Sequence, residues 1–169
     1  MDISVLTSDW TGHRLLDTGD GFKLEEIGGV RMIRSEPKAW WSKSLPAGEW
    51  QKAVAEHKEG GREGHWELRG NCPKEWETQL GKLRFQLRFM DNSKQFGVFA
   101  EQSPHWKWLA QQQPAAANRP RILNLFGYTG AASLVAAQAG WHVTHVDASK
   151  PAVAWGRRNQ ELSGMAQEP

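Results

Sequence analysis

The segment from residue 121 to residue 139 constrains the fold more strongly than any other part of the chain. It begins with Arg121 to Phe126, a short and mostly apolar run, and it ends with the alanine-rich stretch Ala131 to Ala139. The tetrapeptide Gly127-Tyr128-Thr129-Gly130 joins the two. A short apolar run is typical of a parallel strand covered on both faces, and alanine favours helix. We therefore expect a strand, a glycine turn and a helix in this order.

A second unit of the same kind follows directly. The run Trp141 to Val146 predicts another strand, which closes on Asp147. Ser149 can cap a helix that continues from Ala152 to Leu162, with Pro151 in its first turn. The order strand, helix, strand, helix predicts the opening of a doubly wound parallel sheet.

The turn and the carboxylate together predict a nucleoside-binding site. In doubly wound sheets, ligands lie at the carboxyl ends of the strands, and an acidic residue about 20 positions after the turn accepts hydrogen bonds from ribose hydroxyls. Gly127 and Asp147 have this separation. A dinucleotide loop has the glycine spacing G-x-G-x-x-G, which admits a pyrophosphate, whereas Gly127 and Gly130 are spaced G-x-x-G. S-adenosylmethionine has no phosphate, so the turn favours it over NAD. A fragment of an NAD-dependent oxidoreductase stays open as an alternative.

The front part of the chain predicts short antiparallel strands. Glycine-rich turns at 17–21 and 28–29 punctuate the runs Phe22 to Ile27 and Val30 to Arg34, which indicates hairpins. Further strands are expected at His65 to Arg69, Glu75 to Leu80 and Lys82 to Met90. The segment Ala47 to Gly64 reads as a long connection with one helical turn.

The run Lys82 to Met90 alternates strictly between apolar and polar residues, so one face packs and the other is cationic. Its basic residues are candidate contacts for nucleic acid, although solvated strand faces commonly have the same composition. These candidates are Lys82, Arg84 and Arg88.

The fold class predicted from these segments is α/β with three parts. Residues 1–95 form a small β-rich domain, and residues 96–120 a helix and linker. Residues 121–169 form the N-terminal part of a Rossmann-like domain. Within the middle part, Pro104 to Gln113 predicts a helix with Ser103 as its N-cap.

The composition excludes several classes of protein. No apolar run approaches the ~20 residues of a membrane helix, and the N-terminus lacks the basic start and apolar core of a secretory signal. Cys72 is the single cysteine and cannot form an internal disulfide. We expect a cytoplasmic chain without membrane contact or a metal site. The net charge of +2 does not by itself indicate a nucleic-acid-binding protein.

The residues of the turn carry a family resemblance. The stretch LNLFGYTGAASLVAAQAGWHVTHVDASKPAVAWGRRNQELSG resembles the first cofactor-binding motifs of class I S-adenosylmethionine-dependent methyltransferases. More narrowly, it resembles the bacterial subfamily related to large-subunit rRNA cytosine-C5 methyltransferases. FGVFAEQSPHWKWL and LLDTGDGFKLEEIGGVRMIRSEPKAWW resemble the segments that precede the fold in that subfamily.

The resemblance implies S-adenosylmethionine as cofactor and a set of residues that hold it. The turn would lie against the methionine part, with Asn124 in support, and Asp147 would hold the ribose. Ala148 and Ser149 would lie near the adenine, and Gln102, with Phe99, would close the site. The implied cofactor residues are Gln102, Asn124, Phe126, Gly127, Tyr128, Thr129, Gly130, Asp147, Ala148 and Ser149.

Some of these residues also allow a plainer interpretation. Asn124 could be a satisfied polar group of the strand, and Tyr128 could serve in packing alone. His145 lies inside the second strand and is interpreted as structural rather than catalytic.

The sequence departs from the family in lacking Asp-Pro-Pro, the catalytic motif expected on the fourth strand. We therefore expect an incomplete chain of an RNA methyltransferase, with rRNA as one candidate substrate and with unknown catalytic residues beyond residue 169. A two-stranded parallel sheet leaves a bare edge, so a homo-oligomer is a further expectation. A non-catalytic RNA-binding module and a cofactor-binding fragment stay open as alternatives.

Overall fold

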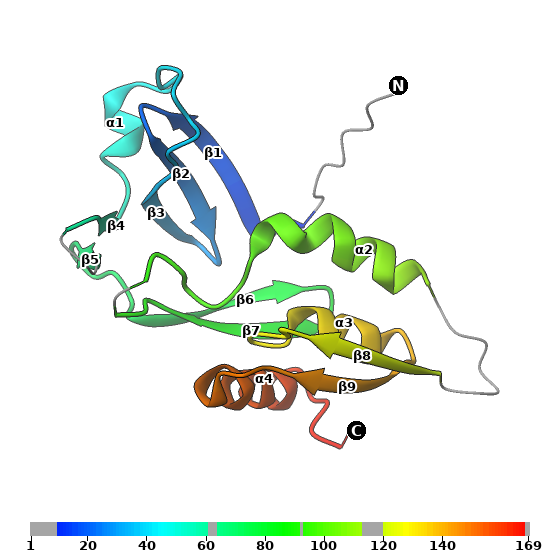
Figure 1. The fold of residues 1–169 in the computed structure, drawn as a ribbon. Coiled ribbons are helices and arrows are strands. Elements are labelled where there is room, and N and C mark those ends of the chain that lie inside the picture. The colour runs from blue at the N-terminus through cyan, green and yellow to red at the C-terminus, as the bar shows by residue number, and fades with distance from the viewer. Residues whose placement is uncertain (1–9, 61–63, 92, 113–119, 168–169) are drawn as a thin grey trace, which may run out of the picture. The chain divides into compact units, whose positions relative to one another are not determined.

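The computed structural model describes residues 10–60, 64–91, 93–112 and 120–167 (Figure 1). Its contacts divide the chain into two compact units, and each is described by itself. The β-sheet unit comprises the described residues of 11–78 and 87–97. The α/β unit comprises Trp10, residues 79–86 and the described residues from 98 onward.

The β-sheet unit is built on a five-stranded sheet with the strand order β1-β2-β3-β4-β5. Neighbouring strands are antiparallel, except that β3 and β4 are parallel. Both predicted hairpins are confirmed, and Gly28 and Gly29 between β2 and β3 have φ values of 54° and 80°, which glycine adopts readily. The strands are β1 His13–Gly19, β2 Phe22–Ile27, β3 Val30–Ser35, β4 Ala55–Lys58 and β5 His65–Leu68.

The predicted connection from Ala47 to Gly64 contains one strand that the sequence analysis missed. The expected helical turn is present as α1 Ala47–Trp50, but β4 then pairs with β3 and β5. Its sequence Ala-Glu-His-Lys has little strand propensity, and Ala55 and His57 are its buried residues. Hydrogen bonding to a strand on each side therefore stabilises β4, rather than the intrinsic strand propensity of its residues.

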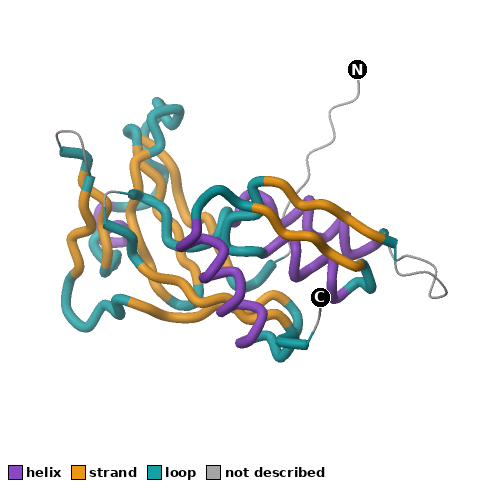
Figure 2. Tube along the Cα trace, turned by 60° about the horizontal axis from the view of Figure 1, so that its bottom comes forward, coloured by secondary structure: helices purple, strands orange, loops and turns teal. Residues whose placement is uncertain are grey.

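The α/β unit contains the predicted strand, helix, strand and helix. The strands β8 Arg121–Leu125 and β9 His142–Val146 are parallel, with Arg121 opposite His142 and Leu125 opposite Val146. They lie side by side in Figure 2. The helix α3 Ala131–Gln138 connects them, and α4 Lys150–Leu162 follows β9. The predicted Rossmann-like α/β fold is confirmed for this part of the chain.

One face of this two-stranded sheet is exposed among the described residues. Leu123 and Leu125 of β8 are 59% and 55% exposed, and Val146 of β9 is 43% exposed. The opposite face packs against α3, whose Leu134 and Val135 are buried. The prediction that the strands are covered on both faces is therefore wrong for the described residues.

The segment before β8 forms the short 3-10 helix η1 Ala100–Gln102 and the helix α2 Ser103–Gln111. Pro104 lies in the first turn of α2, as predicted. The prediction of Ser103 as N-cap is wrong, because Gln102 occupies the N-cap position without a side-chain cap. The backbone of Ser103 is itself helical, with φ −58° and ψ −32°, so Ser103 is the first residue of α2 rather than its cap. Its buried hydroxyl donates to the Ala100 carbonyl at 2.7 Å.

The hairpin of β6 Glu75–Leu80 and β7 Leu83–Arg88 contributes residues to both units. The predicted alternation is confirmed, since Leu83, Phe85 and Leu87 are fully buried and Lys82 is exposed. Residues 79–86 belong to the α/β unit, which is therefore discontinuous in sequence. The division at residues 95 and 120 stays a prediction.

Candidate functional site

The glycine turn follows β8 directly and bends the backbone sharply. Phe126 and Tyr128 have φ values of 57° and 51°, and Gly130 has a φ of 87°. The Gly130 amide donates to the Gly127 carbonyl at 3.0 Å, which closes the turn just before α3 begins. Positive φ at two aromatic residues is uncommon and marks a strained segment at the carboxyl end of the sheet.

Gly127 is required by the neighbouring strand rather than by its own backbone angle. A Cβ at this position would lie 2.3 Å from the imidazole Cε1 of His145 on β9. The Nδ1 atom of His145 lies 2.9 Å from the Ser133 hydroxyl, and Asn124 Nδ2 donates to that hydroxyl at 2.9 Å. This chain of contacts ties β8, α3 and β9 together beneath the turn, which supports a structural role for His145.

Asp147 lies next to the turn at the end of β9. Its Oδ2 atom accepts from the Tyr128 amide at 2.8 Å, and its Oδ1 atom accepts from the Ser149 amide at 2.8 Å. These hydrogen bonds, that to Ser149 first, hold the pKa of Asp147 below its ordinary value. The carboxylate is therefore ionised at neutral pH and fixed to the glycine turn. Each of its oxygens retains a second lone pair for a ligand hydroxyl.

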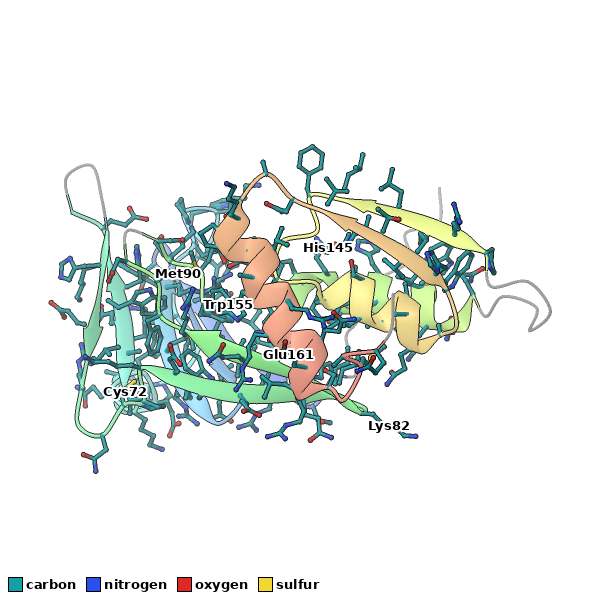
Figure 3. All side chains as sticks on the ribbon, turned by 90° about the horizontal axis from the view of Figure 1, so that it is seen from below. Cys72, Lys82, Met90, His145, Trp155 and Glu161 are labelled. Atoms are coloured by element: carbon teal, nitrogen blue, oxygen red, sulfur yellow. The ribbon has the colours of Figure 1, made fainter. Side chains whose placement is uncertain are left out.

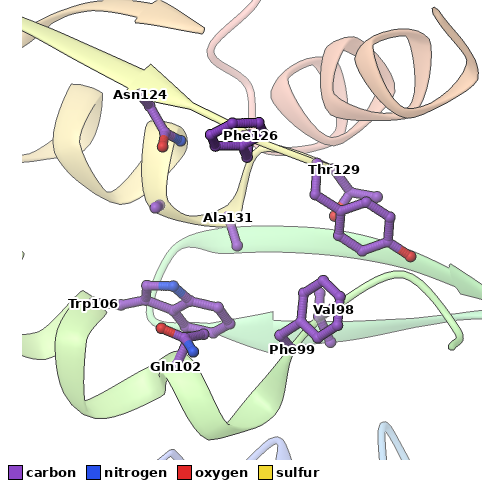
Figure 4. Close-up of a pocket in the computed structure, with 11 residues that line it drawn as sticks. Val98, Phe99, Gln102, Trp106, Asn124, Phe126, Thr129 and Ala131 are labelled. Atoms are coloured by element: carbon purple, nitrogen blue, oxygen red, sulfur yellow. The ribbon is translucent and has the colours of Figure 1, made fainter. Parts of the chain in front are cut away.

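A pocket of about 400 Å³ opens beside the turn. In the close-up, Gln102 and Trp106 lie on one side of it, opposite Asn124 and Phe126 of the β8 segment (Figure 4). Its size falls in the range of small-molecule sites. The lining residues are Val98, Phe99, Gln102, Trp106, Asn124, Phe126, Gly127, Tyr128, Thr129, Ala131 and Ala132.

Aromatic rings form much of this site. The Phe99 ring lies 4.9 Å from that of Tyr128, and the Tyr128 ring lies 6.5 Å from that of Trp155. The Phe126 ring is 87% exposed. Tyr128 is thus fixed by packing, as its plainer interpretation held, and also contributes to the pocket wall.

The predicted cofactor residues fall into two groups. Six line the pocket, namely Gln102, Asn124, Phe126, Gly127, Tyr128 and Thr129. The other four do not line it. Gly130 packs against Gly156 of α4, Asp147 binds the turn, Ala148 is exposed, and Ser149 accepts from the Ala152 amide as the N-cap of α4.

Four pocket residues were not predicted from the sequence, namely Val98, Trp106 and the first two residues of α3, Ala131 and Ala132. Trp106 is buried, with 5% of its surface exposed, and it also lines the pocket. Its spacing of four from Gln102 on one helical segment was the available signal, because residues four apart share a helix face.

The predicted nucleic-acid contacts lie on the β6–β7 hairpin. Lys82 is exposed at the tip of the hairpin, where Figure 3 shows it pointing outward. Arg84 is exposed and Arg88 is half-buried. Lys82 and Arg84 belong to the α/β unit and Arg88 to the β-sheet unit.

Among the described residues, no cluster of three or more His, Cys, Asp or Glu side chains could hold a metal ion. No helix in the same residues has the length and apolarity to cross a membrane.

The comparisons with known proteins agree with the geometry of this site. A solved structure of an S-adenosylmethionine-dependent methyltransferase from Agrobacterium tumefaciens is 41% identical, with a TM-score of 0.90. It covers 96% of this chain, and this chain covers 52% of it. A structure of SMU.776 complexed with SAH has a TM-score of 0.65 at 18% identity and supports the fold alone. No family model matches the chain. The chain is thus related to class I S-adenosylmethionine-dependent methyltransferases.

Within that class, the relatives found by sequence are ribosomal RNA methyltransferases. The ribosomal RNA large subunit methyltransferase K/L of Magnetococcus marinus is 42% identical over 87 residues, which are 51% of this chain and 11% of that protein. The corresponding protein of Pseudomonas putida is 35% identical over 104 residues, which are 56% of this chain and 14% of that protein. The chain therefore spans a small part of these relatives and about half of the Agrobacterium structure.

Proposed function

We propose that the chain forms the front part of an S-adenosylmethionine-dependent RNA methyltransferase and carries one wall of its cofactor site. The observation that supports this most directly is the 2.8 Å hydrogen bond from the Tyr128 amide to the Asp147 carboxylate. It joins the two elements on which nucleoside recognition depends, the turn after one strand and the acidic residue after the next.

The residues of the site fit the proposed cofactor. Asp147 would accept hydrogen bonds from the ribose hydroxyls through its free lone pairs. The first amides of α3, at Ala131 and Ala132 in the pocket, would bind the carboxylate of the methionine part, because a helix N-terminus carries partial positive charge. Phe99 and Phe126 would supply apolar surface for the remainder.

When bound, S-adenosylmethionine supplies an electrophilic methyl group on a sulfonium sulfur. The residues of this chain would bind and orient the cofactor and exclude water from it, which is how positioning accelerates a displacement. No described residue is assigned as a catalytic base. The proposal for this chain is therefore binding, with activity belonging to the whole protein.

The proposed substrate is RNA, on the basis of the names of the sequence relatives and the cationic hairpin. Lys82 and Arg84 would contact phosphates from the α/β unit, and Arg88 from the β-sheet unit. Methylation at cytosine C5 and a cytoplasmic location stay predictions.

We also propose that the chain self-associates when it is alone in solution. Leu123, Leu125 and Val146 form an apolar face that a second copy would cover. A homo-oligomer of this kind would protect the bare sheet.

Calorimetric titration with S-adenosylhomocysteine and with NAD tests the proposed cofactor. We expect binding of the first and none of the second. Asp147→Asn should weaken binding by about tenfold, because it removes a charged hydrogen-bond acceptor from the ribose. Glu161→Gln, which removes an exposed carboxylate on α4, is the matched control and should bind as the wild type does. Binding of NAD in place of S-adenosylhomocysteine would contradict the proposal.

A further inference from the structure

Side chains on one face of α4 form hydrogen bonds with backbone N–H and C=O groups of β7. Trp155, Asn159 and Ser163 are spaced four residues apart, so they lie on one stripe of the helix and its C-cap. Trp155 Nε1 donates to the Gln86 carbonyl at 3.0 Å, and the Gln86 amide donates to Asn159 Oδ1 at 2.9 Å. The Ser163 hydroxyl accepts from the Arg84 amide at 3.0 Å and donates to the Arg84 carbonyl at 3.1 Å.

Asn159 differs from the other two residues because it also reaches the glycine turn. Its Nδ2 atom donates to the Thr129 carbonyl at 2.9 Å. Its side chain is fully buried, and Thr129 is 1% exposed. A single amide thus bonds the edge of β7 with its oxygen and the turn with its nitrogen.

The chemistry of the two partners explains why asparagine occupies this position. The Gln86 amide can only donate and the Thr129 carbonyl can only accept, so one orientation of the Asn159 amide satisfies both. Aspartate would place an oxygen against the Thr129 carbonyl, and leucine would offer neither group. Both partners are backbone groups, so their chemistry does not depend on the side chains at 86 and 129.

The backbone around this contact is closely packed. A Cβ on Gly156, one turn before Asn159, would lie 3.4 Å from the Thr129 carbonyl carbon. A Cβ on Gly130 would in turn lie 3.4 Å from the Gly156 Cα. A Cβ at either glycine would thus be in van der Waals contact, so the backbone of α4 lies close beside the turn.

We infer that Asn159 is a positioning residue for the cofactor turn. It holds the Thr129 carbonyl to the β6–β7 hairpin, so the placement of the turn depends on residues more than forty positions earlier in the chain. This inference rests on the proposed cofactor site, because a positioning role requires a ligand at the turn.

The test compares Asn159→Asp with Ser163→Ala. The first variant keeps an acceptor for Gln86 but loses the donor to Thr129, whereas the second removes bonds to Arg84 and leaves the turn untouched. We expect affinity for S-adenosylhomocysteine, measured by calorimetry, to fall by about tenfold in Asn159→Asp and by less than about twofold in Ser163→Ala. Both variants are compared at a temperature where circular dichroism shows them folded.

Three outcomes would overturn the inference. Asn159→Asp could bind as tightly as the wild type, or Ser163→Ala could lose as much affinity as Asn159→Asp, which would indicate a general effect on folding. Failure of the wild type to bind would remove the proposed function together with the inference, and is thus distinguishable from failure of the inference alone.

A measurement on the unaltered chain gives a second test in case Asn159→Asp does not fold. Saturating S-adenosylhomocysteine should slow amide hydrogen exchange at Gln86, because a fixed turn holds Asn159 against that amide. The amide of Leu24, in the β-sheet unit, is the control and should exchange at the same rate with and without ligand. Unchanged exchange at Gln86 despite binding would contradict a link through Asn159.

Discussion

Two aromatic residues of the turn adopt a backbone conformation that side chains rarely take. Phe126 and Tyr128 lie in the left-handed region, which costs a residue with a Cβ roughly 1–2 kcal/mol. The sequence indicates the turn through its glycines, but Gly127 is needed for the space beside His145, and the strain falls on its neighbours. Neither phenylalanine nor tyrosine carries a sequence signal for positive φ, so this feature could not be predicted.

Replacement of Phe126 by asparagine should stabilise the chain. Asparagine tolerates the left-handed region, and the 87% exposed ring contributes little burial, so we expect a gain of about 0.5–1 kcal/mol in the free energy of unfolding. Urea unfolding measures it. Phe126→Ala, which removes the ring and keeps the strain, is the control. Equal stability of the two variants would contradict a strained turn.

A buried ion pair predicts how acid affects the β-sheet unit. Burial alone would raise the pKa of Glu25, but the hydrogen bond with His13 and the charge of Arg34 outweigh burial and lower it to about 2 from an ordinary 4.5. As the pH falls, Glu25 therefore takes up a proton in the unfolded chain before it does so in the folded chain. The stabilisation is complete above about pH 4.5 and is lost as pH falls toward 2.

Glu25→Gln should remove this part of the pH dependence, leaving a chain that is less stable at neutral pH and loses less stability between pH 4.5 and 2 than the wild type. Urea unfolding at a series of pH values measures the slope. Glu36→Gln, which removes a partly exposed carboxylate of the same unit, should leave the slope nearly unchanged. A slope equal to that of the wild type in Glu25→Gln would exclude the buried pair as its source.

At the scale of elements, the sequence predicts helices and strands best where apolar runs are bounded by clear turn or capping residues. The order of β8, α3, β9 and α4 follows from two apolar runs, the glycine turn and the cap at Ser149, and all four elements are confirmed within two residues. The strand β4 was missed because pairing with β3 and β5 stabilises a polar tetrapeptide. The predicted cap of α2 was wrong because η1 runs directly into α2, so the backbone of Ser103 is already helical.

The candidate site was predictable in part for the same reason. The turn and Asp147 are local signals, and their meeting follows from parallel strands whose carboxyl ends share one edge. Asn159 and Trp155 could not be identified in this way. Their partners are backbone groups on β7 and on the turn. Every residue type has such groups, so the sequence does not indicate which of them will be bonded.

The N-cap of α4 provides a test of an element as a whole. The Ser149 hydroxyl accepts from the Ala152 amide at 3.3 Å, so Ser149→Ala should lower the free energy of unfolding by about 1 kcal/mol. Ser149→Asp offers an equivalent acceptor beside the positive end of the helix and should be as stable as the wild type. Thermal unfolding compares the three chains. Equal loss in both variants would show that the cap is not the cause.

At the scale of the whole molecule, the exposed face of β8 and β9 should govern the state of the chain in solution. We expect the wild type to sediment as a dimer or larger species at micromolar concentration, because Leu123, Leu125 and Val146 are exposed together. The double variant Leu123→Thr with Leu125→Thr should sediment as a monomer, since threonine keeps strand propensity and removes apolar surface.

Leu15→Thr is the control for this experiment, because Leu15 is 58% exposed but lies in the β-sheet unit. It should associate as the wild type does. A monomeric wild type would contradict the proposed self-association, and association of the double variant would exclude this face as its site.

The hairpin of β6 and β7 limits how the gene for such a chain can recombine during evolution. Its residues are divided between the two units, so no single cut in the gene yields both units intact. An exchange after residue 97, for example, would separate residues 79–86 of the hairpin from the remainder of the α/β unit. We therefore expect the two units to have evolved together as one segment, and not to occur as separate domains in other proteins.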